Sequence, residues 1–510
     1  PARRTFTCLG DAVNLSARLM SQAPPGHAYI SEEVHRALSE RVECQLVGDL
    51  TVKGKAEPVR VLSILGLRRG LAKREIRYPL PMVGRDAEMA VCTSTLEAVL
   101  GGAGRVVGIS AEAGRGKSRL VSEFVRNLVA RGVTVAWGEA QNFGRTTSYL
   151  VWRDVWRTLL DVDDDATEAS QGRALTRRLR AVSGDLARRG PLLAAVVGVA
   201  MDDNELTRTF DAKLRKTSLE SLLVDLLAAR AANGALAIVL EDCHWIDSLS
   251  RDLLEELVLA SASLPVLFVL AYRPAEAPGG GLGLDRIPYY QELPLAELTA
   301  SDADSVLRAK LQQLFGGSVT PASELVEFML ERAQGNPYYL EELINYVHGR
   351  GIDPTDPAAF RHLDVPDTLF RLVQSRIDML DETPRTALKV ASVVGRTFES
   401  PFVQGVYPDL GSLEQVEAGF EAARQADIVA IDRIEDRSWL FRHVVARDVA
   451  YDSLPFAMRA HLHDRVGGFV ESGGPSAIEH NLDLLAYHYW LGEDDDKKRE
   501  YAVRAGIAAQ

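Results

Sequence analysis

The sequence has few cysteines and no long hydrophobic run. Its four cysteines, Cys8, Cys44, Cys92 and Cys243, are scattered and form no CxxC pair, which argues against a disulfide framework and against a zinc site. The longest apolar runs, PLLAAVVGVAM and LPVLFVLAY, are shorter than the roughly 18 residues that a membrane-spanning helix needs. We therefore expect a protein of the reducing cytoplasm with no membrane partner.

The sequence also has fewer positively charged than negatively charged residues. The chain has 58 Lys and Arg against 71 Asp and Glu, a formal net charge of -13. An acidic balance of this size disfavours bulk binding to nucleic acid. Nucleic acid is therefore not expected as the main partner.

The hydrophobic pattern changes several times along the 510 residues, which exceed what one core usually serves. Residues 81–295 contain continuous β-branched runs between helical stretches, as is typical of a parallel sheet buried on both faces. The predicted fold class is multidomain, α/β and α. The predicted order is a truncated α+β piece (1–67), a linker (68–80), the parallel-sheet core (81–295), a helical lid (296–365), a winged-helix-like module (366–455) and a helical region where TPR-like repeats would begin (456–510).

The strongest chemical signal is the stretch VVGISAEAGRGKSRL, in which an apolar strand leads through a glycine-bearing loop into a helix. Gly114 and Gly116 let backbone N–H groups turn toward phosphate oxygens at a helix N-terminus. Lys117 is placed to reach the β and γ phosphates, and Ser118 to hold Mg²⁺ or Mn²⁺. Ala111 occupies the first position, where the strict pattern has glycine. The stretch predicts a phosphate-binding loop for ATP.

A second apolar strand, LAIVLEDCHWIDSLS, ends in the adjacent carboxylates Glu241 and Asp242. Mg²⁺-bound ATP needs one carboxylate near the metal and one that orients an attacking water. Both residues are therefore predicted metal-site and catalytic residues of an ATPase, and which of them takes which role stays open.

These two stretches, together with PMVGRDAEM, LAYRP and GNPYYLEEL, resemble the signal-transduction P-loop ATPases, the AAA-like modules found in large regulators and in soluble nucleotide cyclases. The resemblance covers residues 80–350. It implies that Val83 and Arg85 lie by the adenine, that Arg273 is a sensor near the γ phosphate, and that Pro337 closes the lid over the base. A strand cap at Arg273 and an ordinary turn at GNP are the alternatives.

The stretch FRHVVARDVAYDSL resembles the helical region that follows the ATPase in this family. Its His443 is interpreted as structural, because no carboxylate or cysteine stands at metal-ligand spacing.

The beginning of the chain, PARRTFTCLGDAVNLSARLM, predicts a helix over residues 12–23 that starts after Gly10 and Asp11. Asn14 and Arg18 lie one turn apart on a polar stripe of that helix. An amide can orient a ribose, and a guanidinium can stabilise charge that develops on a phosphoryl oxygen. An ordinary amphipathic surface helix is the alternative.

The stretches FTCLGDAVNLSARL, PPGHAYISEEV and VKGKAEPVRVLSIL resemble, in order and spacing, the C-terminal third of class III nucleotide cyclase catalytic domains. The resemblance implies a partial ferredoxin-like fold. It further implies that Asn14 orients the ribose, that Arg18 stabilises the transition state, and that Lys53 with Thr7 reads the purine. A second cyclase domain, from a homodimer or a tandem copy, would complete the site.

Two departures from the cyclase pattern matter. Thr7 stands where the best-known adenylyl cyclases have an aspartate, so ATP or GTP stays open as the substrate. The two metal-binding aspartates of that family lie upstream of the helix, and residues 1–6 contain none. We therefore expect a truncated domain with half a catalytic site, which is inactive as a cyclase alone.

Two functions remain in competition. The first is a fragment of a cytosolic multidomain nucleotide cyclase, a lyase that converts ATP into cyclic AMP and pyrophosphate under the control of its P-loop ATPase. The alternative is an ATP-switched signalling or transcription regulator with a degenerate cyclase remnant. In both, an unknown protein or small-molecule effector would act on the helical tail.

Overall fold

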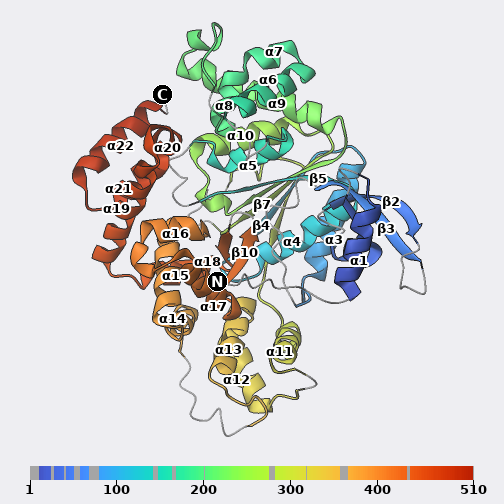
Figure 1. Ribbon diagram of the computed structural model, residues 1–510, viewed down its shortest axis with the longest axis vertical. Coiled ribbons are helices and arrows are strands. Elements are labelled where there is room, and N and C mark those ends of the chain that lie inside the picture. The colour runs from blue at the N-terminus through green and yellow to red at the C-terminus, as the bar shows by residue number, and fades with distance from the viewer. Residues whose placement is uncertain are drawn as a thin grey trace, which may run out of the picture. The chain divides into compact units, whose positions relative to one another are not determined.

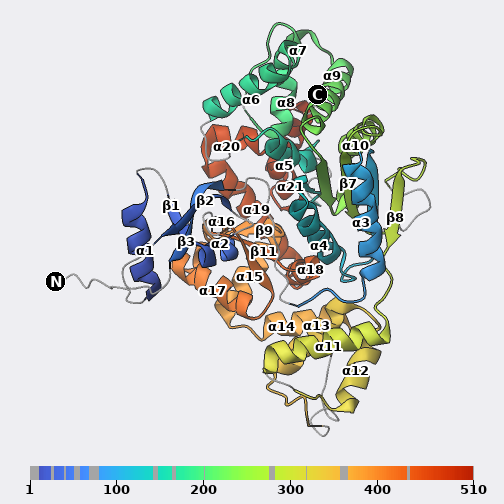
Figure 2. The same ribbon diagram turned by 90° about the vertical axis from the view of Figure 1, so that its right-hand side faces the viewer.

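The computed structural model describes residues 11–24, 28–38, 42–50, 58–67, 80–141, 148–162, 168–199, 201–274, 282–316, 319–356, 366–433 and 437–508. They belong to two compact units, Pro1–Glu75 and Ile76–Gln510, which are described separately (Figures 1 and 2). Within these ranges no helix combines the length and the apolar character that crossing a membrane requires.

The first unit is a small antiparallel sheet with two helices. Its elements are α1 (Asp11–Gln22), β1 (Ala28–Ser31), α2 (Glu32–Leu38), β2 (Val42–Leu50) and β3 (Val59–Leu67), and the strand order is β1-β3-β2. Leu19 from α1 and Val61 and Leu62 from β3 are buried in its core. The sequence predicts α1, α2, β2 and β3 but not the four-residue β1, which is too short to show a periodic pattern.

The second unit is built around a parallel sheet with the strand order β5-β6-β7-β4-β8. The strands are β4 (Arg105–Ser110), β5 (Thr134–Glu139), β6 (Leu236–Glu241), β7 (Val266–Tyr272) and β8 (Tyr290–Pro294). Every residue of β6 and β7 is buried, which explains their continuous apolar sequences. The sequence does not predict β8, because this five-residue edge strand next to β4 has a single buried residue and lacks the continuous apolar run of the other strands.

Helices cover both faces of this sheet. Ile238, Leu240 and Phe268 belong to one large core with the helices α5 (Leu150–Leu159), α8 (Gly190–Val197), α9 (Ala212–Ala231) and α10 (Ser248–Ala260). The helices α3 (Asp86–Leu100) and α4 (Lys117–Ala130) also contact the strands. Between β5 and α9 the chain inserts further short helices, α6 (Glu168–Val182), α7 (Gly184–Arg188) and α8.

Three helices follow the sheet in the region predicted as the lid, namely α11 (Ala300–Phe315), α12 (Ser323–Ala333) and α13 (Pro337–Gly349). The side chain of Asn336 starts α13 by accepting hydrogen bonds from the backbone N–H groups of Tyr338 and Tyr339, both at 3.1 Å. Pro337 follows as the first helical residue, where its missing N–H has no cost. This capping orders the segment that faces the phosphate-binding loop.

The described residues that follow are mostly helical and contain one small sheet. The next elements are α14 (Leu369–Asp378), α15 (Glu382–Val394), β9 (Thr397–Glu399), α16 (Ser400–Val406), α17 (Leu413–Gln425), β10 (Val429–Arg433), β11 (Ser438–Phe441) and α18 (Val444–Asp452). The strands form an antiparallel sheet in the order β10-β11-β9, over a core that contains Phe398, Phe420 and Phe441. We call residues 382–452 the C-terminal module; Figure 1 shows it in orange to red-orange.

Four helices close the described chain: α19 (Phe456–Ser472), α20 (Gly474–His480), α21 (Leu482–Leu491) and α22 (Asp495–Ala508). Tyr489 and Tyr501 stack with ring centroids 5.3 Å apart and join α21 to α22. Glu471 accepts hydrogen bonds from both phenol groups and from Lys497.

Candidate nucleotide-binding site

The loop between β4 and α4 has the backbone that a phosphate requires. Gly114 and Gly116 have φ angles of 81° and 93°, in the left-handed region that favours glycine. Gly116 directly precedes α4, so the loop leads into a helix N-terminus. Gly114 also allows the lid to come close, because a Cβ there would lie 3.0 Å from Oδ1 of Asn336. The loop therefore meets the predicted lid directly.

Lys117 is folded back onto its own loop. Its Nζ donates to the carbonyl oxygens of Ala111 at 2.5 Å and of Glu112 at 3.1 Å. Burial lowers the pKa of Lys117 to about 8; Asp242 opposes this shift and Arg273 adds to it. The phosphate chain of a nucleotide would place negative charge next to Lys117 and would favour its charged form.

Three carboxylates lie at the carboxyl ends of neighbouring strands. Glu241 ends β6 and faces Glu139, the last residue of β5, in the strand register. Asp242 follows in a left-handed conformation with φ of 53° and lines the cavity next to the loop. Burial raises the pKa of Asp242, and Arg396 and Lys117 oppose the shift. The sequence identifies Glu241 and Asp242 but not Glu139, which carries no motif.

An arginine of the C-terminal module contacts these carboxylates. Nη1 of Arg396 lies 2.6 Å from Oε1 of Glu139 and 3.6 Å from Oδ2 of Asp242. Burial lowers the pKa of Arg396, but Glu139, Glu241 and Asp242 outweigh it and raise the pKa, so the guanidinium stays charged. The backbone carbonyl of Arg396 accepts from the N–H of Phe441, which fixes the turn between α15 and β9. No feature of the sequence indicates this contact.

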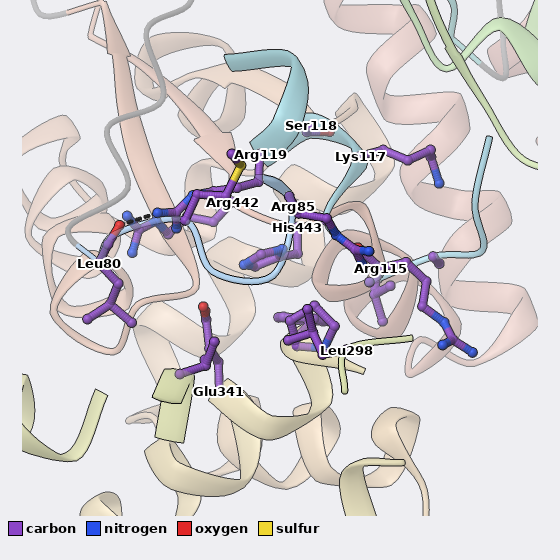
Figure 3. A pocket seen from close by; sticks show the side chains of 18 of the residues that line it. Leu80, Arg85, Arg115, Lys117, Ser118, Arg119, Leu298, Glu341, Arg442 and His443 are labelled. Carbon is purple, nitrogen blue, oxygen red and sulfur yellow. Dashed lines mark hydrogen bonds between the residues drawn. The ribbon is translucent and has the colours of Figure 1, made fainter. Parts of the chain in front are cut away.

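The opposite end of the cavity combines apolar side chains with the charged side chains of Arg119, Glu341 and Arg442 (Figure 3). The cavity lining at this end includes Leu80, Val83, Leu298, Val306, Pro337, Tyr338 and His443. His443 stacks on Tyr338 with ring centroids 3.9 Å apart. Burial lowers the pKa of His443 to about 3, so the ring is neutral and suits an apolar surface. This end can accept a flat base while the loop holds phosphates.

Arg85 supports the wall of the cavity. It is 6% exposed, and its Nη2 donates to the carbonyl oxygens of Ala296 at 2.7 Å and of Arg115 at 3.2 Å. Its Nη1 donates to Glu88 at 3.0 Å. Arg85 thus joins the segment before α3, the phosphate-binding loop and the segment after β8.

The structure brings most of the predicted residues of the ATPase site to one cavity, whereas Glu241, which is 3% exposed at the end of β6, is not among the described residues that line it. The cavity lining includes Val83, Arg85, Gly114, Gly116, Lys117, Ser118, Asp242, Arg273 and Pro337, while the Ala111 carbonyl holds Lys117. The cyclase half-site is different: Thr7, Lys53 and the side chain of Asn14 lie outside the described residues, and Arg18 is half-buried on α1. Its assembly stays a prediction.

The side-chain oxygen atoms that could bind a divalent cation are few but suitable. In the described part of the chain, no group of three or more His, Cys, Asp and Glu residues could hold a metal ion by itself. Ser118 and Asp242 both line the cavity beside Lys117. Mg²⁺ usually takes one or two protein oxygens and completes its shell with phosphate oxygens and water. These two side chains therefore fit a metal ion that arrives with a nucleotide.

Comparison with known proteins supports the ATPase core. Residues 81–269 match the family model of the AAA ATPase domain. The chain is also 26% identical to an uncharacterized protein of Rhizobium meliloti (strain 1021), over 98% of this chain and 47% of that protein. The chain therefore spans about half the length of this relative.

Similar solved structures include a signal transduction ATPase with numerous domains (STAND) from Pyrococcus horikoshii, which has a tetratricopeptide repeat sensor. It shares 13% identity, with a TM-score of 0.48 over 85% of this chain and 51% of that chain. The Aeropyrum pernix Orc1 protein, solved in complex with DNA, shares 14% identity with a TM-score of 0.33 over 76% and 97% of the two chains. These overall similarities are too low to bear on the function of this chain.

Proposed function

We propose that this chain is a cytoplasmic, ATP-switched signalling regulator whose AAA-type domain controls the docking of the C-terminal module. The observation that carries the proposal is the contact of Arg396 with Glu139 and Asp242 inside the nucleotide cavity. An arginine from outside the ATPase core thus occupies the carboxylate end of the site. Nucleotide binding and module docking therefore depend on the same side chains.

The nucleotide would enter with its base between Val83 and Pro337 and its phosphates at the loop. Lys117 would leave the carbonyls of Ala111 and Glu112 and donate to the β and γ phosphates. Arg273, which lines the cavity near Lys117, would donate to the γ phosphate. Mg²⁺, held by Ser118 and Asp242, would neutralise phosphate charge. Glu241 is the candidate to orient an attacking water, so hydrolysis would reset the switch.

The switch follows from competition for Asp242. A carboxylate that coordinates Mg²⁺ has less negative charge left for a guanidinium 3.6 Å away. Binding of Mg²⁺-ATP should therefore weaken the contact of Arg396 and shift the population toward a released C-terminal module. An effector acting on residues 456–510 would bias the same equilibrium.

Hydrogen exchange tests the proposed switch. We expect Mg²⁺-ATP to increase amide exchange in the peptide that covers Phe441 at the end of β11, because the N–H of Phe441 donates to the carbonyl oxygen of Arg396 and this bond loosens on release. Exchange on α12 of the lid, which lies away from this contact, serves as the internal reference. Unchanged exchange at the Phe441 amide under saturating Mg²⁺-ATP would contradict the proposed switch.

A finer proposal concerns residues 1–67. We infer that they are the C-terminal part of a class III cyclase domain, in which Asn14, Arg18, Lys53 and Thr7 would serve ribose, phosphate and purine. The support is the sequence resemblance together with the position of Arg18 on α1. The proposal of an ATP-switched regulator stands without it, because that proposal is argued from residues of the second unit alone.

The half-site makes a definite prediction about activity. The stretches that match the cyclase pattern supply groups for ribose and phosphate but no pair of metal-binding aspartates. We therefore expect the purified 510-residue chain to form little or no cyclic AMP or cyclic GMP with Mg²⁺ or Mn²⁺. Product detection by chromatography measures this. Sustained turnover that Arg18→Ala abolishes would show instead that the site is complete.

A further inference from the structure

Arg85 connects the phosphate-binding loop to the segment that leads from β8 to α11, which we call the connector (residues 295–299). Its Nη2 donates both to the carbonyl oxygen of Ala296 in the connector, at 2.7 Å, and to that of Arg115 in the loop, at 3.2 Å. Its Nη1 donates to Oε1 of Glu88 at 3.0 Å, which orients the guanidinium plane. Because Arg85 is buried, these hydrogen bonds are shielded from water and are stronger than surface contacts.

A second contact joins the same two segments. Nη2 of Arg115 lies 2.8 Å from Oε1 of Glu297, the residue that follows Ala296 in the connector. The side chain of Glu297 is 58% exposed, so this ion pair contributes little by itself. The buried guanidinium of Arg85 is therefore the stronger link between the loop and the connector.

The connector in turn contacts the region predicted as the lid. The N–H of Leu298 donates to the carbonyl oxygen of Gly335, just before α13, at 2.9 Å. A Cβ at Gly335 would lie 2.7 Å from the carbonyl oxygen of Leu298, so glycine is needed for this close approach. Likewise, a Cβ at Gly84 would lie 2.7 Å from Cγ of Asp302 in the first turn of α11. The connector therefore cannot move without disturbing α11 and the start of α13.

We propose that Arg85 is a positioning residue that transmits nucleotide binding at the loop to the predicted lid. Arg115 lies between Gly114 and Gly116, so phosphates bound by the N–H groups of this loop would fix the orientation of the Arg115 carbonyl. That carbonyl would hold Arg85, and Arg85 would hold the connector at Ala296. Arg85, Arg115 and Leu298 all line the cavity (Figure 3). This inference rests on the proposed nucleotide site and deepens it by naming the residue that links the loop to the lid.

The geometry of the side chain suggests two variants. The planar guanidinium of arginine presents several N–H donors in fixed directions, whereas the ammonium group of lysine is a point charge on a flexible stem. Arg85→Lys therefore keeps the positive charge but loses the fork that reaches three acceptors. Arg85→Met removes both the charge and the fork.

A second arginine provides the matched control. Arg131, at the end of α4, lies 2.7 Å from Glu97 of α3, and the two side chains are 42% and 55% exposed. This pair joins the helices that follow Arg85 and the loop, but it lies outside the cavity lining. Arg131→Met should therefore leave the link between the loop and the lid unchanged.

The test measures hydrogen exchange at the amide of Leu298, which reports on the contact between the connector and the predicted lid. We expect saturating ATP to slow this exchange by about tenfold in the wild type and in Arg131→Met, within the range usual for coupling between two sites. In Arg85→Lys and Arg85→Met, the ratio of the rates without and with ATP should fall to about one, because the link is lost. Calorimetry on the same samples gives the ATP concentration that saturates each variant.

The ratio separates a positioning role from a structural one. If Arg85 only supports the fold, its replacement raises exchange equally with and without ATP and leaves the ratio unchanged. An unchanged ratio in Arg85→Lys, which keeps the charge and is expected to fold, therefore overturns the role of Arg85. A wild type that binds ATP without slowing exchange at Leu298 also overturns it. A wild type that does not bind ATP overturns the proposed function itself.

Discussion

Replacing Lys117 with alanine will weaken ATP binding by about 100-fold, which corresponds to ~3 kcal/mol for truncating one partner of a buried charge contact. In the described part of the chain, the ammonium group donates hydrogen bonds to the carbonyl oxygens of Ala111 and Glu112. These neutral acceptors stabilise the ammonium group much less than the charged oxygens of a triphosphate would. Calorimetry or a fluorescent ATP analogue measures the change.

The protonation of Lys117 adds a second readout. Since its pKa is lowered to about 8, the nucleotide-free chain loses this charge as pH rises through that value. Phosphates favour the charged form, so ATP binding takes up a proton there and affinity falls at higher pH. Lys117→Ala should remove this pH dependence.

An exposed lysine provides the control. Lys213→Ala removes a positive charge from the start of α9, where the side chain is exposed, and should leave ATP affinity unchanged. Unaltered ATP binding by Lys117→Ala would mean that the loop is not a phosphate site.

Replacing Arg396 with methionine will destabilise the nucleotide-free chain by ~3 kcal/mol. Glu139, 4% exposed, would lose the guanidinium that lies 2.6 Å from its Oε1, and breaking a buried pair from one side typically costs ~3–5 kcal/mol. Methionine keeps much of the side-chain volume, so the loss reports mainly on charge. Urea unfolding followed by circular dichroism measures the change.

The control for this variant is an arginine–aspartate ion pair that is exposed to solvent. Arg371 and Asp367 are 3.2 Å apart but 70% and 63% exposed, so Arg371→Met should cost less than ~0.5 kcal/mol. Equal effects of the two variants would show that the contact of Arg396 is as weak as a surface pair.

The sequence predicts the parts of the site that are contiguous in the chain. The phosphate-binding loop, Lys117 and the acidic end of β6 lie within short segments, where strand, loop and helix signals coincide. The parallel sheet is equally visible, because buried strands need continuous apolar residues. Val83, Arg273 and Pro337 are predicted only through the resemblance to the signal-transduction P-loop ATPases.

The missed residues depend on tertiary contacts. Glu139 gains its role only because β5 pairs with β6 and brings it opposite Glu241. Arg396 enters the site from a turn of another module, and Glu341 lines the cavity because α13 starts at Pro337. None of these residues has a local pattern that distinguishes it from an ordinary surface charge.

The most direct test of the switch is the affinity of Arg396→Met for ATP, measured with and without Mg²⁺. Our account predicts that Mg²⁺-ATP binds this variant about tenfold more tightly than the wild type, since the metal no longer competes with a guanidinium for Asp242. It predicts no gain without Mg²⁺. Weaker binding of Mg²⁺-ATP by Arg396→Met would contradict the account and would show that Arg396 holds the nucleotide instead of competing with it.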